Sequence, residues 1–241
     1  MDRAPRFAFL VLEEHPYGRE MLRQLLGRGF VPRVVVSEDS DLAREERVKF
    51  EARVAGHPLA PLLARQCTER AVPLERVGRH RSRDLVERLA PLDLDLIVLG
   101  GTRILRGALL DLPADGVVNS HPGLLPECRG SASPAWSVLH DLPLGATAHF
   151  CDSGVDTGDL LLRRELPVRR GATYEDLCHG TLVLAGELMA EALGAWVEGR
   201  WGELRRPQGP SPHGTFRNAP EEVLERVRAK LAAQTYAHYV D

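Results

Sequence analysis

Cysteine is scarce in this 241-residue chain, and the four cysteines that occur exclude two common stabilising devices. They stand at positions 67, 128, 151 and 178, and no two of them form a C-x-x-C pair. The spacing of zinc ligands is therefore absent. A disulfide framework is not expected either, because four cysteines are few for a chain of this length. We accordingly predict no metal site.

An excess of charge of either sign is also lacking. The chain has 31 basic and 34 acidic residues and a formal net charge of −3, whereas nucleic-acid-binding proteins usually present a strongly basic face. The N-terminal apolar run "FAFLVL" has only six residues, too few for a signal peptide or a membrane span. We expect a cytoplasmic protein with no nucleic-acid or membrane partner, built as one large domain or as a domain with a modest appendage.

Short apolar runs alternate with amphipathic segments through the first half of the chain. The pattern predicts strands at 6–12, 32–38, 73–77, 94–101 and 116–121, and helices at 18–30, 44–56, 60–70, 82–92 and 105–110, with Ser82 as an N-cap. This rhythm predicts an α/β fold with a Rossmann-like, doubly wound, mainly parallel sheet that has helices on both faces.

The second half of the chain has a different pattern. Residues 146–152 alternate apolar and polar, which predicts a half-exposed strand, and the strand predicted at 159–168 could pair with it in antiparallel fashion. A long helix is predicted at 173–199, with Thr173 and Asp176 forming a capping box. The segment 200–218 is predicted to be a loop, and 220–234 a final helix with Pro220 at its start. We therefore expect a catalytic domain at 1–199 and a C-terminal loop and helix extension at 200–241.

Three polar side chains are placed where parallel sheets bind ligands, at the carboxyl ends of strands. Asn119 and His121 lie two residues apart in a predicted strand, so their side chains face one spot. Asp156 lies in the loop "DSGVDTGD", between Gly154 and Gly158. An amide and an imidazole can stabilise the oxyanion that forms when an amine attacks a carbonyl. A nearby carboxylate would orient the imidazole and help to pass protons.

Each of these residues also has an ordinary structural interpretation. A single histidine is more often a hydrogen-bonded structural residue than a catalytic one, and aspartates in a loop are often turn formers. His149 is expected to face the sheet surface or to orient the site. Cys128 and Cys151 flank the site but most free cysteines behave as small hydrophobes. The combination of Asn119, His121 and the Asp156 loop favours the catalytic interpretation.

Three segments, "LGGTRIL", "VVNSHPGLLPECRG" and "ATAHFCDSGVDTGDLLLRRELPV", together resemble the formyltransferase family over roughly 94–168. This family uses 10-formyltetrahydrofolate and includes glycinamide ribonucleotide transformylase and methionyl-tRNA formyltransferase. The resemblance implies that Asn119, His121 and Asp156 are catalytic. It also implies that two segments bind the folate co-substrate: Thr102, Arg103, Ile104 and Leu105, and then Asp152, Ser153, Gly154 and Val155.

The acceptor side of the site departs from these relatives. Where the transformylase has a phosphate-binding loop after its first strand, this chain has Glu13 and Glu14, which would repel a phosphate and suit an amine, or form a solvated turn. Arg129 and Gly130 are expected to border the acceptor pocket, with a helix-initiating loop as the alternative. The arginines of the tail 205–217 could contact a phosphate or carboxylate, although a surface loop is the commoner interpretation.

The expected activity is transfer of a formyl group to a primary amine of a small molecule, either an amino-sugar nucleotide or an amine or amino acid of secondary metabolism. About forty residues follow the long helix, too few for the tRNA-binding domain of methionyl-tRNA formyltransferase. The alternatives are a formyltetrahydrofolate deformylase, a glycinamide ribonucleotide transformylase and a catalytically silent folate-binding protein. Known deformylases of this type carry an extra N-terminal domain, and this chain begins with its first strand. A homodimer is possible, since dimers are common among the relatives.

Overall fold

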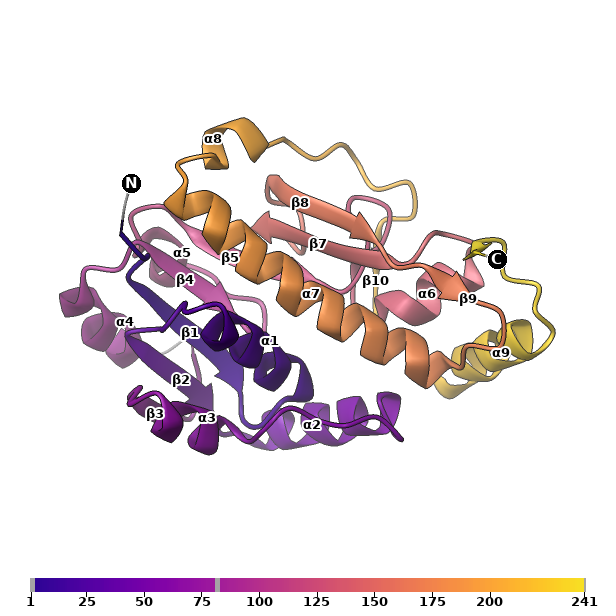
Figure 1. Ribbon diagram of the computed structural model, residues 1–241, viewed down its shortest axis with the longest axis horizontal. Coiled ribbons are helices and arrows are strands. Elements are labelled where there is room, and N and C mark those ends of the chain that lie inside the picture. Colours follow the sequence, from indigo (N-terminus) through magenta and orange to yellow (C-terminus); the bar gives the residue numbers. More distant parts are fainter. Residues whose placement is uncertain (1–2, 81–82, 241) are drawn as a thin grey trace.

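The computed structural model describes residues 3–80 and 83–240. A seven-stranded sheet in the order β3-β2-β1-β4-β5-β7-β8 forms its centre (Figure 1). The strands are β1 Phe7–Leu12, β2 Val34–Glu38, β3 Leu74–Val77, β4 Leu96–Leu99, β5 Val117–His121, β7 Gly145–Phe150 and β8 Leu160–Glu165. The first five of these are parallel to one another. Strand β7 pairs with β5 in antiparallel fashion, and β8 pairs with β7 in the same way. The α/β, Rossmann-like prediction is confirmed, and so is the antiparallel pairing of β7 with β8.

Helices cover both faces of the sheet. Those of the first half are α1 Pro16–Gly27, α2 Asp41–Arg53, α3 Leu63–Glu69, α4 Arg83–Leu89, the 3-10 turn Ala90–Leu92 and α5 Ala108–Asp111, and those of the second half are α6 Ser133–Leu139, α7 Tyr174–Val197, α8 Trp201–Leu204 and α9 Glu221–Ala232. In Figure 1, α1 and α7 cross the near face of the sheet, while α4 and α5 lie behind it.

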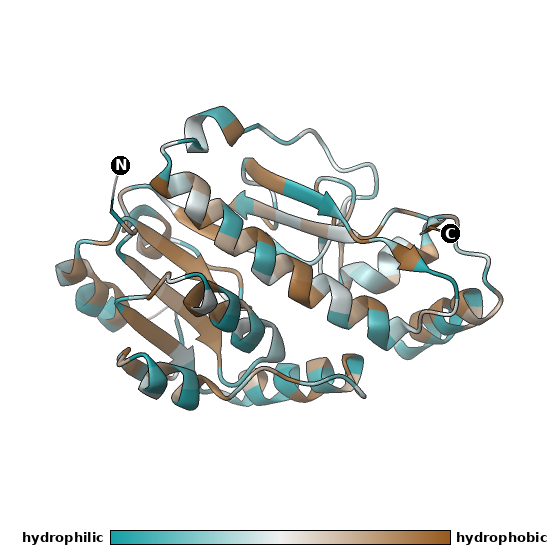
Figure 2. Cartoon of the chain, in the orientation of Figure 1, coloured by the Kyte–Doolittle hydropathy of each residue, from teal (hydrophilic) through white to brown (hydrophobic). Residues whose placement is uncertain are grey.

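The alternation of side chains along β1 divides the core into two layers. Phe7, Phe9 and Val11 point into a cluster with apolar residues of α1 and α7. Ala8 and Leu10 point the other way, into a cluster with residues of α4 and α5. All five side chains are fully buried, and Figure 2 shows the central strands as strongly hydrophobic. Burial on both faces explains why these strands are continuous apolar runs.

Several elements differ from the sequence-based expectations. Every residue of β7 is buried, although alternation had predicted a half-exposed strand, because β7 lies between β5 and β8 and α7 packs against it. Helix α1 begins at Pro16, two residues earlier than expected, and Pro220 is the N-cap of α9 rather than its first residue. The Thr173–Asp176 capping box is present. The predicted N-cap Ser82 lies outside the described residues.

The C-terminal segment packs back onto the rest of the protein. Residues 200–218 are not loop alone, because they contain α8 and the two-residue strand β10 Thr215–Phe216. Strand β10 pairs with β6 Arg129–Gly130, and β11 Tyr239–Val240 pairs with β9 Val168–Arg169. We call residues 205–218 the strap, because they run from α8 across the β7–β8 edge toward α9 (Figure 1). The division of the chain after residue 199 stays a prediction.

Helix α7 has the length and composition of a membrane span, with a mean hydropathy of 1.3 over its most apolar window. However, 67% of that window is buried inside the fold. Core helices of soluble proteins pass the same test, so this helix is only weak evidence for a membrane.

Candidate active site

A cavity of about 810 Å³ opens at the carboxyl ends of β4 and β5, where a doubly wound sheet binds its ligands. Side chains of Asn119, His121 and Asp156 all line this cavity. Its volume lies within the range of small-molecule sites. The three residues that the sequence singled out are therefore brought together.

Asn119 is oriented by a neighbouring histidine. It pairs in register with His149 of β7, and Asn119 Nδ2 lies 3.3 Å from His149 Nε2. His149 Nδ1 lies 2.7 Å from the carbonyl oxygen of Phe150. A carbonyl oxygen only accepts, so Nδ1 carries the hydrogen and Nε2 can accept from the Asn119 amide. Burial lowers the pKa of His149 to about 4, which keeps this imidazole neutral at pH 7.

His121 is buried and has an oxygen near each ring nitrogen. Its Nε2 lies 2.7 Å from the carbonyl oxygen of Cys128 and 2.9 Å from Ser133 Oγ, while its Nδ1 lies 3.5 Å from Asp156 Oδ2. The Cys128 carbonyl requires a hydrogen on Nε2. The Nδ1 of His121 faces the Asp156 carboxylate at the cavity wall.

Asp156 is held in an unusual backbone conformation. Its φ is +53°, in the left-handed region that non-glycine residues rarely adopt. Its Oδ2 accepts a hydrogen bond from the Gly130 N–H at 2.9 Å, and its Oδ1 lies 3.7 Å from His149 Nε2. The carboxylate therefore lies between two imidazoles, and its position is fixed by the backbone of β6.

The loop that carries Asp156 is built by close backbone packing. A Cβ atom on Gly158 would lie 2.0 Å from the carbonyl oxygen of Phe150, so only glycine permits this approach. Asp152 Oδ1 accepts from the Gly154 N–H at 2.9 Å and from Thr157 Oγ1 at 2.5 Å. Asp152 thus shapes the turn, as its structural interpretation had suggested.

The strap contributes a second support for this loop. Gln208 Nε2 donates to the carbonyl oxygens of Asp156, at 3.1 Å, and of Gly158. Gln208 Oε1 accepts from the Arg129 guanidinium at 2.9 Å. One side chain therefore connects the Asp156 loop to β6, whose Gly130 holds the Asp156 carboxylate.

The two segments expected to hold the folate border the same cavity. Thr102, Arg103, Ile104 and Leu105 all line it, as do Asp152, Gly154 and Val155. Ser153 does not line the cavity and is exposed. The Arg103 guanidinium is paired with Glu38 at 2.7 Å and donates to Ser40 Oγ at 3.0 Å. These contacts hold the segment 102–105 against the end of β2.

Only one of the four residues expected to contact the acceptor lines the cavity. Gly130 lines the cavity, but Arg129, Glu13 and Glu14 do not. Glu14 instead accepts from the Leu63 N–H at 3.1 Å, at the start of α3, and lies 3.8 Å from Arg19. Glu13 pairs with Arg76 at 3.3 Å.

Sequence reasoning missed part of the cavity wall. His15 and Tyr17 at the start of α1, Phe50 and Arg53 of α2, and Phe216 and Arg217 of the strap all line it. His15 Nδ1 accepts from the Tyr17 N–H at 3.3 Å, and burial lowers the pKa of His15 to about 3, with a smaller contribution from the charge of Arg53. No sequence motif had marked any of these residues.

The cysteines near the site are protected from ionisation. Cys151 lines the cavity, and burial raises the pKa of its thiol far above the usual value. Burial also raises the pKa of the Cys128 thiol. A thiolate nucleophile is therefore disfavoured at both positions. Within residues 3–80 and 83–240, no group of three potential metal ligands is found.

Comparison with known proteins agrees with the geometry. The family model described as formyl transferase matches residues 6–193. The chain belongs to the formyltransferase family. Family membership points to an enzyme that uses a formyl donor.

The relatives within this family differ in their named activities. Methionyl-tRNA formyltransferase of Pelobacter propionicus is 35% identical over 148 residues, which is 60% of this chain and 46% of that protein. Glycinamide ribonucleotide transformylase 1 of Symbiobacterium toebii is 25% identical, with a TM-score of 0.62 over 85% of this chain and 95% of that one. A formyltetrahydrofolate deformylase of Pseudomonas syringae is 16% identical, with a TM-score of 0.64 over 83% of this chain and 63% of that one, and shows the fold alone.

The curated relatives are longer than this chain. The chain spans about half the length of the methionyl-tRNA formyltransferases it matches. Formyl transfer is thus the activity common to the family model and these relatives, and the acceptor differs among the matched proteins.

Proposed function

We propose that this protein transfers a formyl group from 10-formyltetrahydrofolate to the primary amine of a small molecule in the cytoplasm. The observation that carries the proposal is the convergence of Asn119, His121 and Asp156 on one cavity wall. Residues 102–105 and, except for Ser153, residues 152–155 border the same cavity and are available to bind a folate. The deformylase among the structural neighbours supports a folate donor.

The reaction is an acyl transfer between two nitrogens. The acceptor amine attacks the formyl carbon, and the carbonyl oxygen acquires negative charge. The Asn119 amide and the Nδ1 N–H of His121 donate hydrogen bonds to that oxygen. The bond between the formyl carbon and the folate nitrogen then breaks, and that nitrogen receives the proton lost by the amine. The products are the formylated amine and tetrahydrofolate.

Asp156 serves this reaction in two ways. Its carboxylate lies 3.5 Å from His121 Nδ1, where it orients the imidazole. The same carboxylate can accept a hydrogen bond from a water molecule that carries the proton from the amine to the leaving nitrogen. No covalent enzyme intermediate is needed, in agreement with the neutral thiols of Cys128 and Cys151.

A small acceptor is supported by the size of the cavity and by the net charge of −3. One specific observation favours each of two alternatives. Several relatives at 30% identity or more are named methionyl-tRNA formyltransferases, which favours an aminoacyl acceptor. A structural neighbour is named as a deformylase, in which water would replace the amine.

The test is release of tetrahydrofolate from 10-formyltetrahydrofolate, followed spectroscopically with a panel of amines. The panel contains amino-sugar nucleotides, amino acids, polyamines, glycinamide ribonucleotide and methionyl-tRNA. Release that depends on a small amine supports the proposal and names the acceptor class. Release without any amine would identify a deformylase, and release only with methionyl-tRNA would overturn the small acceptor.

A further inference from the structure

Two arginines line the main cavity without an acidic partner. Arg53 is the last residue of α2, and Arg217 follows β10 in the strap, so they come from distant parts of the chain. Among the residues that the structure describes, neither guanidinium forms an ion pair or a hydrogen bond to a carboxylate. Arg53 is half-buried and Arg217 is exposed.

Two other cations near the cavity are paired with carboxylates. Lys49 lies 3.0 Å from Glu46, and Arg103 lies 2.7 Å from Glu38. Of the strap arginines, Arg205 pairs with Asp159 at 2.6 Å and does not line the cavity. Arg53 and Arg217 are therefore distinguished both by their place in the cavity wall and by their lack of a counter-ion.

Both arginines are anchored without using their charge on a protein carboxylate. The Arg53 guanidinium lies over the Phe50 ring, 5.9 Å from its centroid. The Arg217 carbonyl oxygen accepts a hydrogen bond from Trp136 Nε1 at 2.7 Å. The Phe216 ring next to it stacks on Trp136, with centroids 5.0 Å apart. The backbone of Arg217 is thus fixed, while its N–H donors are left for a ligand.

A second cavity adjoins the main one. It has a volume of about 350 Å³ and shares Arg53 and Asn218 with the first, while its other cations, Lys49 and Arg228, are paired with glutamates. Arg53 therefore lies where the two cavities meet. Three carboxylates also line the main cavity: Glu46 is paired with Lys49, Asp152 is bonded within its own turn, and Asp156 lies beside His121. The walls are therefore complementary to a ligand that has both an amine and an acidic group.

We propose that Arg53 and Arg217 bind a carboxylate or phosphate of the acceptor, so that the acceptor is an amine that also carries an acid. This inference rests on the proposed function, in which an amine is the formyl acceptor. Guanidinium groups suit such anions because their N–H donors match two oxygens at once. The acidic group of the acceptor would bind to the arginines of α2 and the strap, and its amine would lie near Asn119 and His121.

The folate donor is a second source of the same chemistry, because its glutamyl tail carries carboxylates. Neither Arg53 nor Arg217 belongs to the segments expected to bind the donor, 102–105 and 152–155. We therefore assign the two arginines to the acceptor, and the experiment separates the two sources.

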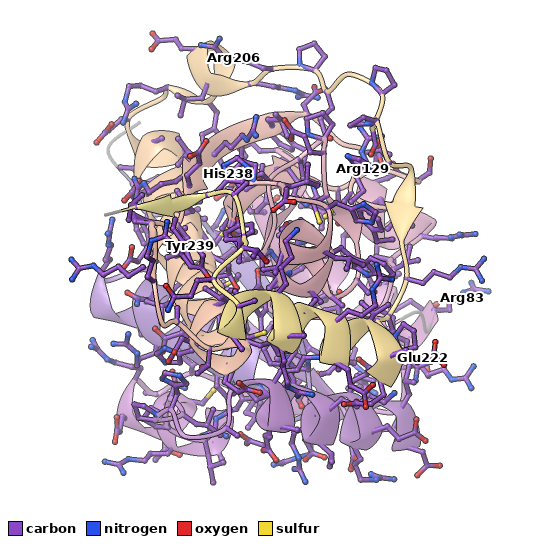
Figure 3. All side chains as sticks on the ribbon, turned by 90° about the vertical axis from the view of Figure 1, so that its right-hand side faces the viewer. Arg83, Arg129, Arg206, Glu222, His238 and Tyr239 are labelled. Carbon is purple, nitrogen blue, oxygen red and sulfur yellow. The ribbon has the colours of Figure 1, made fainter. Side chains whose placement is uncertain are left out.

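The first measurement needs no turnover. Inorganic phosphate is titrated into the wild-type protein and into Arg53→Gln, Arg217→Gln and the double variant by isothermal titration calorimetry. The matched control is Arg206→Gln, since Arg206 lies on the strap, near the top of Figure 3, and does not line the cavity. We expect each cavity variant to weaken phosphate binding about tenfold, and the control to leave it unchanged. Equal binding in the wild type and the double variant, or no binding to the wild type, would overturn the proposal.

The second measurement separates acceptor from donor. The affinity for 5-formyltetrahydrofolate, a folate with the same glutamyl tail, is measured by fluorescence for the same variants. We expect it to stay within about twofold of wild type. A tenfold loss in the double variant would assign the arginines to the donor and overturn the acceptor assignment. Because neither measurement depends on catalysis, an inactive protein that binds phosphate through these arginines would contradict the proposed function alone.

Discussion

Gln208 donates a hydrogen bond from its side-chain amide to the carbonyl oxygen of Asp156, at 3.1 Å and across 52 residues of sequence. The same side chain accepts from Arg129, the residue before Gly130. A residue of the C-terminal strap therefore stabilises both segments that position the Asp156 carboxylate. The strap is part of the site even though it contains none of the family motifs on which the sequence-based prediction depended.

The Gln208→Glu variant tests this support. A carboxylate cannot donate to the Asp156 and Gly158 carbonyl oxygens, but it can still accept from Arg129. We expect kcat to fall about tenfold, the cost of roughly one hydrogen bond, with KM for both substrates little changed. Steady-state kinetics measures kcat and both KM values, and Arg206→Gln is the control. An unchanged kcat would show that the loop keeps its position without Gln208.

Gly130 is the second support, and its replacement by alanine should be costly. Its φ is +98°, and a Cβ atom would lie 2.0 Å from the Phe216 carbonyl oxygen, so β6 and β10 would have to separate. Gly214 is a matched control, because its φ is +70° but a Cβ atom there would have no neighbour within 4 Å.

We expect Gly214→Ala to reduce the free energy of unfolding by about 1 kcal/mol, from backbone strain alone, with normal turnover. Gly130→Ala should lose more stability and at least about tenfold in kcat, because the Gly130 N–H would leave the Asp156 carboxylate. Urea unfolding and steady-state kinetics check both. Equal behaviour of the two variants would contradict the role of Gly130.

His149 is expected to be a positioning residue that acts through Asn119. Replacing it with phenylalanine removes the acceptor of the Asn119 amide at 3.3 Å while retaining a ring of similar size. We expect kcat to fall about tenfold and KM for the acceptor to change little, because Asn119 acts on the transition state. His179→Gln on α7 is the control. A rise in KM with normal kcat would instead place His149 in substrate binding.

Two buried histidines should make the protein less stable in mild acid. Burial lowers the pKa of His15 to about 3 and of His149 to about 4, from an ordinary value of 6.5. Between pH 6.5 and about 4 the unfolded chain binds protons at these positions that the folded chain does not. The free energy of unfolding should therefore fall as the pH falls through this range, by roughly 1.4 kcal/mol per pH unit for each histidine.

Urea denaturation at pH 7.5 and at pH 5 measures the effect. His15→Asn should reduce the difference between the two pH values, and its side chain can still accept from the Tyr17 N–H. His213→Gln, at an exposed strap position, should leave the difference unchanged. A stability that is independent of pH in this range would contradict the buried, neutral state of both histidines.

The sheet and the catalytic strand could be predicted because local pattern and tertiary environment agree there. Continuous apolar runs identified β1, β2 and β4, and the two-residue period of β5 placed Asn119 and His121 on one face. The burial of β7 could not be predicted, because the hydroxyl of Thr147 and the imidazole of His149 gave it an alternating pattern. Both polar groups are satisfied inside the fold, by Gly123, Leu125, Phe150 and Asn119.

The acceptor side of the cavity was the least predictable part. Glu14 carried a clear charge signal, but its carboxylate is used at the start of α3, a contact across 49 residues. Strand β10 has only two residues and no periodic pattern, so nothing in the sequence places Arg217 beside α2. That Arg217 and Arg53 line one cavity depends on how the strap crosses the fold, which is a property of the tertiary structure rather than of any local segment.

The most direct test of the catalytic account is a single-turnover measurement of formyl transfer with an amine that supports release of tetrahydrofolate. Wild type is compared with His121→Ala and Asp156→Asn, after circular dichroism and urea unfolding have shown that both variants fold. We expect the rate of the chemical step to fall by several orders of magnitude in each variant, on the order of 10³-fold or more, because oxyanion stabilisation and proton transfer are removed. A variant that folds and transfers the formyl group at a rate near that of wild type would contradict the roles assigned to His121 and Asp156.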